Sequence, residues 1–196
     1  MSWFRRTPIA AARWVAIDCE TSGLDAARDR LLSVGAVAVR GGRIELARSF
    51  SALVRQAAPS PVPNILVHGI GGDAQLAGLP LTDVMRDLAA YAGDAALPVG
   101  FHAAFDVAVL RRHGFVAREP WLDLAALAPV LFPNRKAKLL DDWLAEFGIA
   151  VHARHNALGD AFLTAQLLLV MLAEGERQGI HTVQDLRALQ RAGRWL

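Results

Sequence analysis

Two carboxylates stand two positions apart at the end of an apolar segment, in the sequence Asp18-Cys19-Glu20. Because alternate side chains of a β-strand share one face, Asp18 and Glu20 are expected to project together, with Cys19 directed into the core. Carboxylates that share a site repel each other, and such a site normally supplies a cation. The pair therefore suggests a metal site, although an Asp-x-Glu at a strand end is more often a solvated edge.

Two further acidic residues follow, each at the start of an expected helix. In Phe101-His-Ala-Ala-Phe-Asp106 an apolar strand runs into a helix, which places Asp106 in the first turn of that helix. In His155-Asn-Ala-Leu-Gly-Asp160, Asn156 is the expected N-cap of a long apolar helix that presents Asp160 about one turn later. Acids near helix starts are ordinary capping chemistry, so each segment alone favours a structural role.

The three segments combine four carboxylates and one imidazole, from Asp18, Glu20, Asp106, Asp160 and His155. Hard divalent cations such as Mg²⁺ prefer carboxylate oxygens and retain waters that can react. Two such ions about 3.5–4 Å apart lower the pKa of an attacking water and stabilise a leaving oxygen. An imidazole can take the proton of that water at neutral pH. The set predicts a metal-dependent nuclease that hydrolyses phosphodiester bonds.

The elements that must position these residues begin with three strands. Apolar segments predict strands at residues 14–18 and 33–39, the second ending in the turn Gly41-Gly42. A third strand is expected at residues 44–54. The three are expected to form an antiparallel meander, and the first of them ends at the Asp18 carboxylate.

Helical spacing begins after a proline-rich loop, with Thr82 as the expected N-cap of the next helix. A strand at residues 97–101 follows, and Asp123 and Asp141-Asp142 fit helix N-terminal roles. Later helices are expected at residues 139–147 and 158–174 and after the capping-box sequence Thr182-x-x-Asp185. Strands that come early and then alternate with helices predict an α/β fold, with a mixed central sheet flanked by helices, in a single domain over residues 1–196.

Composition limits the class of protein. The 196 residues are enough to bury a core, and mean hydropathy is +0.28. The longest apolar segment, residues 161–173, is shorter than the roughly 20 residues that cross a bilayer, so we expect a buried helix and no membrane partner. The single cysteine excludes an internal disulfide framework and favours a cytoplasmic protein. A net charge of +2 permits a nucleic-acid partner, although scattered arginines are by default a solvated surface.

The motifs resemble those of the DEDDh exonucleases of the DnaQ type, relatives of the epsilon (proofreading) subunit of DNA polymerase III. In chain order they are Ile17-Asp18-Cys-Glu20-Thr-Ser-Gly23-Leu24, Val67-His-Gly-Ile70, Ala103-Ala-Phe-Asp106 and His155-Asn-Ala-Leu-Gly-Asp160. The resemblance spans about residues 14–174 and leaves 175–196 as a C-terminal helical extension. It implies a ribonuclease H-like fold and a 3′→5′ exonuclease that releases nucleoside monophosphates.

The resemblance also implies a role for each residue of the motifs. Asp18, Glu20 and Asp160 would hold the metal that activates water, and Asp18 would reach a second ion as well. Asp106 would act directly or through a metal-bound water, and His155 would be the general base. The expected cofactor is Mg²⁺, as two ions, with Mn²⁺ able to substitute for it.

Candidate substrate contacts are Thr21, Leu24, His68, His102 and Phe105. Leu24 has loop packing as its alternative, and His68 could merely close a turn. Two departures from the family pattern bear on this pocket. Phe101-His102 stands where the family often has His-Asn, which puts the contacts of that Asn in doubt, and Gly71 replaces a frequent Thr.

Other functions with the same motifs stay open at this point. We expect single-stranded nucleic-acid 3′ ends as the partner, DNA favoured over RNA, and a repair or proofreading role. An RNA-trimming exoribonuclease would carry the same motifs, because contacts to the 2′-OH decide between them. A non-catalytic binding module predicts damaged catalytic positions, and all five are intact. A stand-alone enzyme is favoured, with a homodimer or association with a polymerase also open.

Overall fold

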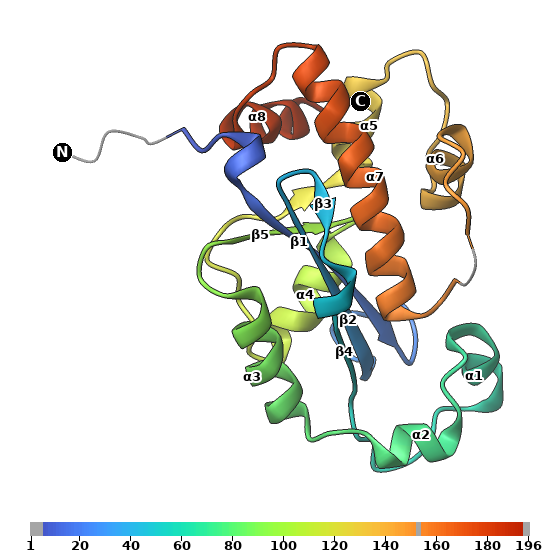
Figure 1. The fold of residues 1–196 in the computed structure, drawn as a ribbon. Coiled ribbons are helices and arrows are strands. Elements are labelled where there is room, and N and C mark those ends of the chain that lie inside the picture. The colour runs from blue at the N-terminus through green and yellow to red at the C-terminus, as the bar shows by residue number, and fades with distance from the viewer. Residues whose placement is uncertain (1–5, 152–153, 194–196) are drawn as a thin grey trace.

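A mixed β-sheet stands between two groups of helices in the computed structural model, which describes residues 6–151 and 154–193 (Figure 1). The strands are β1 Arg13–Thr21, β2 Leu31–Arg40, β3 Arg43–Ile44, β4 Phe50–Leu53, β5 Ala96–Gly100 and β6 Leu122–Asp123. The α-helices are α1 Val62–His68, α2 Gly72–Ala77, α3 Leu81–Ala92, α4 Ala104–Arg112, α5 Leu124–Leu131, α6 Leu140–Glu146, α7 Ala157–Arg177 and α8 Val183–Gly193. Two 3-10 turns, η1 Ile9–Ala11 and η2 Leu46–Arg48, complete these elements.

The strands follow the order β3-β2-β1-β5-β6, with β4 also pairing with β2. β2 is antiparallel to β1, β3 and β4, whereas β5 is parallel to both β1 and β6. The predicted mixed sheet with an antiparallel first part is confirmed. The parallel half brings the carboxyl ends of β1 and β5 to one edge, where the chain leaves β5 for α4.

The third strand, expected to be continuous, is broken into β3 and β4. Val39 pairs with Ile44 and Ala36 pairs with Phe50. The two paired positions are therefore three residues apart in β2 but six residues apart in the later segment. The 3-10 turn η2 takes up the excess residues and returns the chain to the same edge of β2. β3 and β4 are therefore both antiparallel to β2, as predicted, but the prediction of one continuous strand was wrong.

Two hydrophobic cores occupy the two faces of the sheet. Trp14 and Ala16 of β1 lie in the core with α5, α6, α7 and α8, whereas Val15 and Ile17 lie in the core with α3 and α4. The alternation continues beyond Ile17, and the next odd-numbered residue, Cys19, packs against the α3–α4 core as expected. The even-numbered carboxylates of β1 are thereby directed to the face that α7 covers.

Helix starts were predicted unevenly. Asn156 caps α7 by accepting a hydrogen bond from Gly159 N at 3.0 Å, which confirms that prediction. At α8 the cap is also confirmed, because Asp185 N donates to Thr182 Oγ1 at 3.3 Å. The N-cap of α3 is Pro80 and not Thr82, since the fixed proline φ of −54° leads the chain directly into the helix.

Helix α7 decides the question of the membrane-like apolar segment. Among the described residues it is the single helix with the length and apolar composition to cross a membrane, and 56% of its most apolar window is buried inside the protein. It packs on β1 and β2, so it is a core helix, as predicted. The expected C-terminal extension contains α8, and its residues 194–196 lie outside the described part of the chain.

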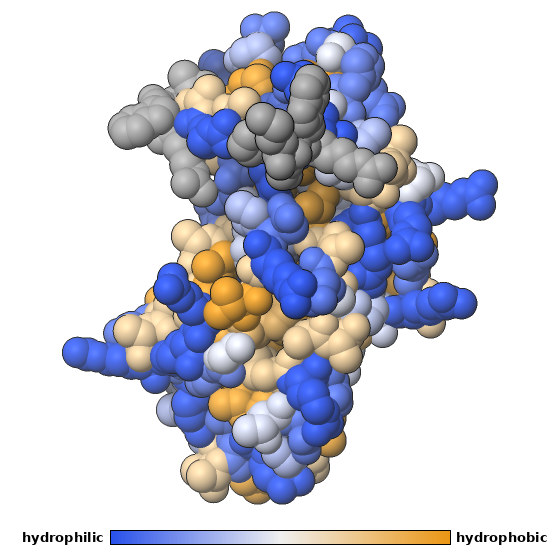
Figure 2. All heavy atoms as spheres, turned by 90° about the vertical axis from the view of Figure 1, so that its left-hand side faces the viewer, coloured by the Kyte–Doolittle hydropathy of each residue, from blue (hydrophilic) through white to orange (hydrophobic). Residues whose placement is uncertain are grey.

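The surface mixes charged and apolar side chains. Figure 2, seen from the side that carries α3, shows apolar residues interspersed with charged ones over the lower part of the molecule. Several arginines there and elsewhere are paired: Arg86 contacts Asp83 at 2.8 Å, and Arg118 contacts Asp94 at 3.1 Å. These exposed ion pairs agree with the solvated-surface interpretation of the scattered arginines.

Candidate active site

The structure brings together carboxylates from two distant parts of the chain. Asp18 and Glu20 at the end of β1 and Asp160 in the first turn of α7 each offer an oxygen within 4.8 Å of the others. Asp160 is 5% exposed, and the two strand residues are half-buried. The first and third sequence motifs therefore form one acidic cluster.

Gly35 explains why α7 starts so close to these strand carboxylates. It pairs with Asp18 across the β1–β2 ladder. A Cβ atom at this position would overlap the backbone of Ala157 and Leu158, the first residues of α7. Only glycine lets the helix start rest on the sheet there, and Asp160 lies one turn further along. Sequence reasoning missed Gly35, although a glycine inside an otherwise apolar strand is the usual sign of close backbone approach.

Asp106 lies beside this cluster, on the other side of β1, and its charge acts on Asp18. Beyond Ala16, β1 no longer pairs with β5, which leaves the Cys19 amide on an open strand edge. Asp106, 6% exposed in the first turn of α4, accepts a hydrogen bond from that amide through Oδ1 at 3.0 Å. The bond satisfies a backbone donor and fixes the start of α4 against the end of β1.

Burial and mutual repulsion make the charged forms of these carboxylates costly. Burial, followed by the charges of neighbouring acids, raises the pKa of Asp18 well above its usual range. The same causes raise the pKa of Glu20 to about 7. Burial raises the pKa of Asp106 to about 7 and also raises that of Asp160. Oxygen donors held together against repulsion fit a hard divalent cation, which would compensate their charge.

Arg154 is a neighbour that sequence reasoning missed. Its side chain is 26% exposed and forms an ion pair with Asp160, while its Nε lies 2.7 Å from Asp141 Oδ1 in the first turn of α6. The guanidinium lowers the pKa of Asp160, against the larger effect of burial. The protein thus places one cation of its own beside the cluster. No local pattern predicts this contact, because Asp141 comes from a separate helix.

Two histidines precede the two helices that carry site carboxylates. His102, with φ of 55°, and His155, with φ of 59°, are the non-glycine residues of positive φ in the described part of the chain. The amide of His155 donates to Asp160 Oδ2 at 3.1 Å, and that of His102 donates to Asp123 Oδ1 at 3.0 Å. Both are exposed. Such backbone conformations are sparsely populated and gather at functional sites.

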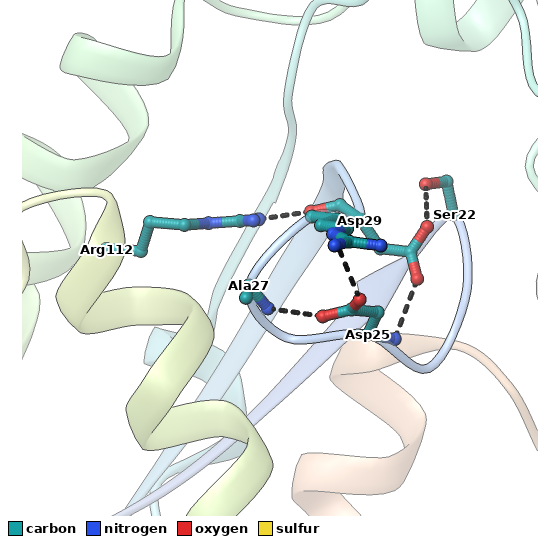
Figure 3. Close-up of polar contacts among 6 residues, drawn as sticks. Ser22, Asp25, Ala27, Asp29 and Arg112 are labelled. Carbon is teal, nitrogen blue, oxygen red and sulfur yellow. Dashed lines mark hydrogen bonds and ion pairs between the residues drawn. The ribbon is translucent and has the colours of Figure 1, made fainter.

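The last residue of β1 and the loop after it carry two of the predicted substrate contacts, Thr21 and Leu24. Thr21 donates its hydroxyl to Gly23 O at 2.6 Å, which closes the first turn of the loop. Leu24 is 93% exposed, so the loop-packing alternative for this residue is wrong. Figure 3 shows the polar network beside it, in which the Asp29 side chain receives hydrogen bonds from Ser22 and Asp25.

The remaining predicted contacts differ in accessibility. His68 is 4% exposed, and its Nδ1 accepts a hydrogen bond from Ile70 N at 3.0 Å, which agrees with the turn-closing alternative. Phe105 is half-buried against the α3–α4 core. The exposed His102 ring meets Phe101 edge to face at 4.8 Å, and Phe101 itself packs on the α5–α8 core. The accessible members of the predicted set are therefore Leu24 and His102.

Fold and site together define a ribonuclease H-like nuclease, with a mixed sheet whose central strand ends in carboxylates. A family model described as exonuclease, RNase_T, matches residues 15–168. The chain belongs to this exonuclease family. The family resemblance drawn from the motifs is confirmed.

Relatives among known proteins agree with this assignment. The DNA polymerase III subunit epsilon of Aquifex aeolicus is 30% identical over 185 residues, 91% of this chain and 90% of that protein. A DNA polymerase III subunit epsilon-like protein of Rhodobacter capsulatus is 33% identical over 184 residues, 90% of this chain but 26% of that protein. PolC-type DNA polymerase III of Bacillus subtilis is 31% identical over 88% of this chain and 12% of its own length. The chain spans only about a quarter of the length of the Rhodobacter capsulatus protein and about an eighth of that of the Bacillus subtilis protein.

Solved structures give the fold independently of these sequences. Exonuclease X in complex with 5′ overhanging duplex DNA matches with a TM-score of 0.72 and 24% identity, covering 90% of this chain and 99% of that chain. Exonuclease I of E. coli in complex with a dT13 oligonucleotide matches with a TM-score of 0.71 and 15% identity, covering 85% of this chain and 42% of that chain. The predicted ribonuclease H-like fold is confirmed.

Proposed function

We propose that this exonuclease removes nucleotides one at a time from the 3′ ends of single-stranded DNA and releases nucleoside monophosphates. The observation that carries the proposal is the cluster of Asp18, Glu20 and Asp160, whose oxygens lie within 4.8 Å of one another. The names of similar proteins add support, since they include DNA polymerase III epsilon subunits and a nuclease in complex with a DNA oligonucleotide. The proposed role is repair or proofreading, which the family resemblance of the motifs implies.

The carboxylates have the chemistry to hold two divalent ions. In the proposal, Asp18, Glu20 and Asp160 would hold one Mg²⁺, and Asp18 and Asp106 would hold a second, directly or through water. Mn²⁺ is expected to substitute, because both ions accept oxygen ligands. When bound, such ions activate an attacking water and stabilise the leaving oxygen of the broken phosphodiester bond. Burial of Asp106 and Asp160 keeps competing water away from the anionic side chains.

His155 is proposed as the general base. Its amide is anchored to Asp160 at 3.1 Å, while its side chain is exposed and can meet the phosphodiester from the solvent side. A base must lie within hydrogen-bond reach of the proton that it removes, and the anchored backbone restricts the imidazole to the neighbourhood of the cluster. The next residue, Asn156, is also held in place, because its side chain caps α7 by accepting a hydrogen bond from Gly159 N.

Substrate class and polarity are tested by one comparison. Single-stranded DNA, a mismatched duplex and RNA of the same sequence, each labelled at the 5′ end, are incubated with the protein and Mg²⁺ or Mn²⁺. We expect a ladder that shortens from the 3′ end, fastest on single-stranded DNA. Faster digestion of RNA would assign the RNA-trimming alternative, and release of the labelled 5′ nucleotide first would contradict the proposed polarity.

A matched variant separates this activity from a contaminating nuclease. Asp18→Asn keeps the size of the side chain but removes its negative charge and replaces one ligand oxygen of the cluster by an amide NH₂. We expect this variant to leave every substrate intact under the same conditions. Asp83→Asn, on the outer surface of α3, removes a carboxylate outside the cluster and is expected to digest DNA at the wild-type rate.

A further inference from the structure

The loop at residues 22–30 presents one large apolar side chain to solvent. Leu24 is 93% exposed, although Gly23 before it and Asp25 after it are both held by hydrogen bonds or close packing. An apolar residue at the tip of a mobile loop would be unremarkable, because single exposed hydrophobic residues are common. An exposed leucine between two fixed neighbours requires a separate explanation.

The carboxylate of Asp29 is the centre of this loop. Its Oδ2 accepts a hydrogen bond from Asp25 N at 2.7 Å, and its Oδ1 accepts one from Ser22 Oγ at 3.1 Å (Figure 3). Ser22 Oγ in turn accepts from Arg30 N at 2.9 Å. Backbone bonds from Arg28 N and Asp29 N to Asp25 O, at 3.0 and 2.8 Å, close the far side of the loop.

The same carboxylate also fills the space beside Gly23. A Cβ atom built on Gly23 would lie 2.5 Å from Asp29 Oδ2 and 2.8 Å from its Cγ. Any side chain at position 23 would therefore displace the carboxylate from its hydrogen bonds. Asp29 contacts the residues on both sides of Leu24, so it determines where the leucine is held.

Two contacts join this loop to the rest of the site. Arg112, at the end of α4, donates from Nη2 to the carbonyl of Asp29, as Figure 3 shows. Asn64 of α1 donates from Nδ2 to the carbonyl of Ser22. The first turn of α4 carries the catalytic candidate Asp106, and its last residue, Arg112, contacts the loop. Helix α4 therefore connects the loop to the carboxylates at the end of β1.

We propose that Asp29 is a positioning residue for the nucleic-acid substrate, which holds Leu24 in a fixed place where it contacts the 3′-terminal nucleotide. The inference rests on the proposed function, because it requires a strand whose 3′ end enters the site. Asp29 does not touch the reacting atoms. Asp29 holds the loop in one conformation before the nucleic acid binds. The loop therefore loses less conformational entropy when the nucleic acid binds.

A double-mutant cycle tests the proposal. KM and kcat on 5′-labelled single-stranded DNA are measured for the wild type, Asp29→Ala, Leu24→Ala and the double variant. We expect each single change to raise KM about tenfold, with a smaller effect on kcat, because both remove binding and leave the carboxylate cluster intact. If Asp29 acts through Leu24, the double variant has nearly the KM of either single variant.

The contradicting result is equally definite. Were the two effects to multiply in the double variant, or were Asp29→Ala to leave KM unchanged, Asp29 would have only a general role in stability. Mn²⁺ binding, measured by titration of each folded variant, is expected to match the wild type. A loss of Mn²⁺ binding in Asp29→Ala would also overturn the inference, since the effect would then pass through the cluster.

Two milder variants serve if Asp29→Ala fails to fold. Asp29→Asn keeps one acceptor oxygen in the same volume, and Arg112→Met keeps the aliphatic stem but removes the donor to the Asp29 carbonyl. Each is expected to raise KM by a smaller factor than Leu24→Ala, and an unchanged KM in both would contradict the proposal. If the wild type digests DNA but the cycle is additive, this inference alone fails. If the wild type digests no strand, the proposed function fails.

Discussion

The carboxylates of this protein fall into two groups that differ in what surrounds them. Glu174, near the end of α7, receives hydrogen bonds from Arg177 and Gln178, which lower its pKa to about 2. Backbone amides of Leu139 and Lys138 lower the pKa of Asp142 at the start of α6. In the active site, by contrast, burial raises the pKa of every carboxylate, and the negative charges of neighbouring acids raise those of Asp18 and Glu20 further.

This difference separates carboxylates that favour the fold from carboxylates that oppose it. An acid whose pKa is lowered by folding adds stability above its unfolded pKa, whereas an acid whose pKa is raised opposes folding once it is ionised. The second group makes a few structural contacts, such as the bond from the Cys19 amide to Asp106, but its raised pKa values show that these contacts do not offset the cost of its charges. Its arrangement is explained by a cation that binds the folded protein, and this places the cost in stability at the active site.

The largest expected effect is on catalysis. Asp18→Asn is expected to lower the rate of DNA hydrolysis at saturating Mg²⁺ by about a thousandfold or more, because the central ligand of the cluster is lost. Initial rates on 5′-labelled single strands measure it, with circular dichroism to verify folding. A folded variant with wild-type activity would show that Asp18 is not part of the mechanism.

His155→Ala is expected to lower kcat by about 10²–10⁴-fold, the usual contribution of a general base. Unlike the change at Asp18, it should leave Mn²⁺ affinity close to that of the wild type, because the backbone bond from residue 155 to Asp160 is retained. Titration of Mn²⁺ alongside the kinetic assay distinguishes the two roles. Loss of both activity and metal binding would contradict a base that is separate from the ligands.

Gly35→Ala tests the close approach of α7 to β2. The added methyl group overlaps the backbone of Ala157 and Leu158, so α7 must shift away and carry Asp160 with it. Overpacking of this kind costs about 1–3 kcal/mol, and a displaced catalytic group can lose about a hundredfold in rate. Thermal melting and initial rates measure the two effects. Gly71→Ala, where the added Cβ meets open space, is the matched control.

Arg154→Met is expected to tighten Mn²⁺ binding by roughly fivefold, because the ion no longer competes with a guanidinium for Asp160. Asp141→Asn should act in the opposite direction, since it removes the other carboxylate that Arg154 contacts. Calorimetric titration of the metal-free protein measures both constants. Weaker binding in Arg154→Met would mean that the arginine supports the ion instead of competing with it.

The smallest effect belongs to the surface group. The pKa of Glu174 lies at about 2 in the folded protein against an ordinary value of 4.5, so its stabilising contribution is present above pH 4.5 and lost as the pH falls towards 2. Glu174→Gln should therefore melt slightly lower than the wild type at pH 7, and this difference should shrink in acid. A difference in Tm between the two proteins that stays constant from pH 7 to about pH 2 would contradict a stabilising role for the ionised Glu174.

Local patterns were sufficient for the motifs and for most strands and helices, because alternation and helix caps are properties of neighbouring residues. The short helices α1 and α2 were not predicted, since their prolines and glycines indicate a loop. The same-face placement of Asp18 and Glu20 and the Asn156 cap follow from such patterns. The broken third strand does not, since the excess residues of η2 appear only when two segments are paired. A register mismatch is a property of two strands.

Contacts between distant segments were also beyond sequence reasoning. Gly35 could have been noticed as a glycine inside an apolar strand, but its partner at the start of α7 could not. Arg154 meets Asp141 through the packing of α6 beside α7, and the exposure of Leu24 depends on Asp29 folding back over Gly23. Each of these residues affects the geometry or charge of the site but lies outside the residues that the motifs identify as ligands or general base.

The most direct test of the central claim is thermal unfolding of the wild type and Asp18→Asn, each with and without Mn²⁺. We expect the variant to melt higher than the wild type in the absence of metal, because one repelling charge has been removed from a buried cluster. Mn²⁺ should raise the Tm of the wild type and leave that of the variant nearly unchanged. The claim is that these carboxylates destabilise the metal-free protein and are stabilised by a bound cation. A variant with a lower Tm than the wild type without metal, or with an equal rise in Tm on adding Mn²⁺, would contradict it.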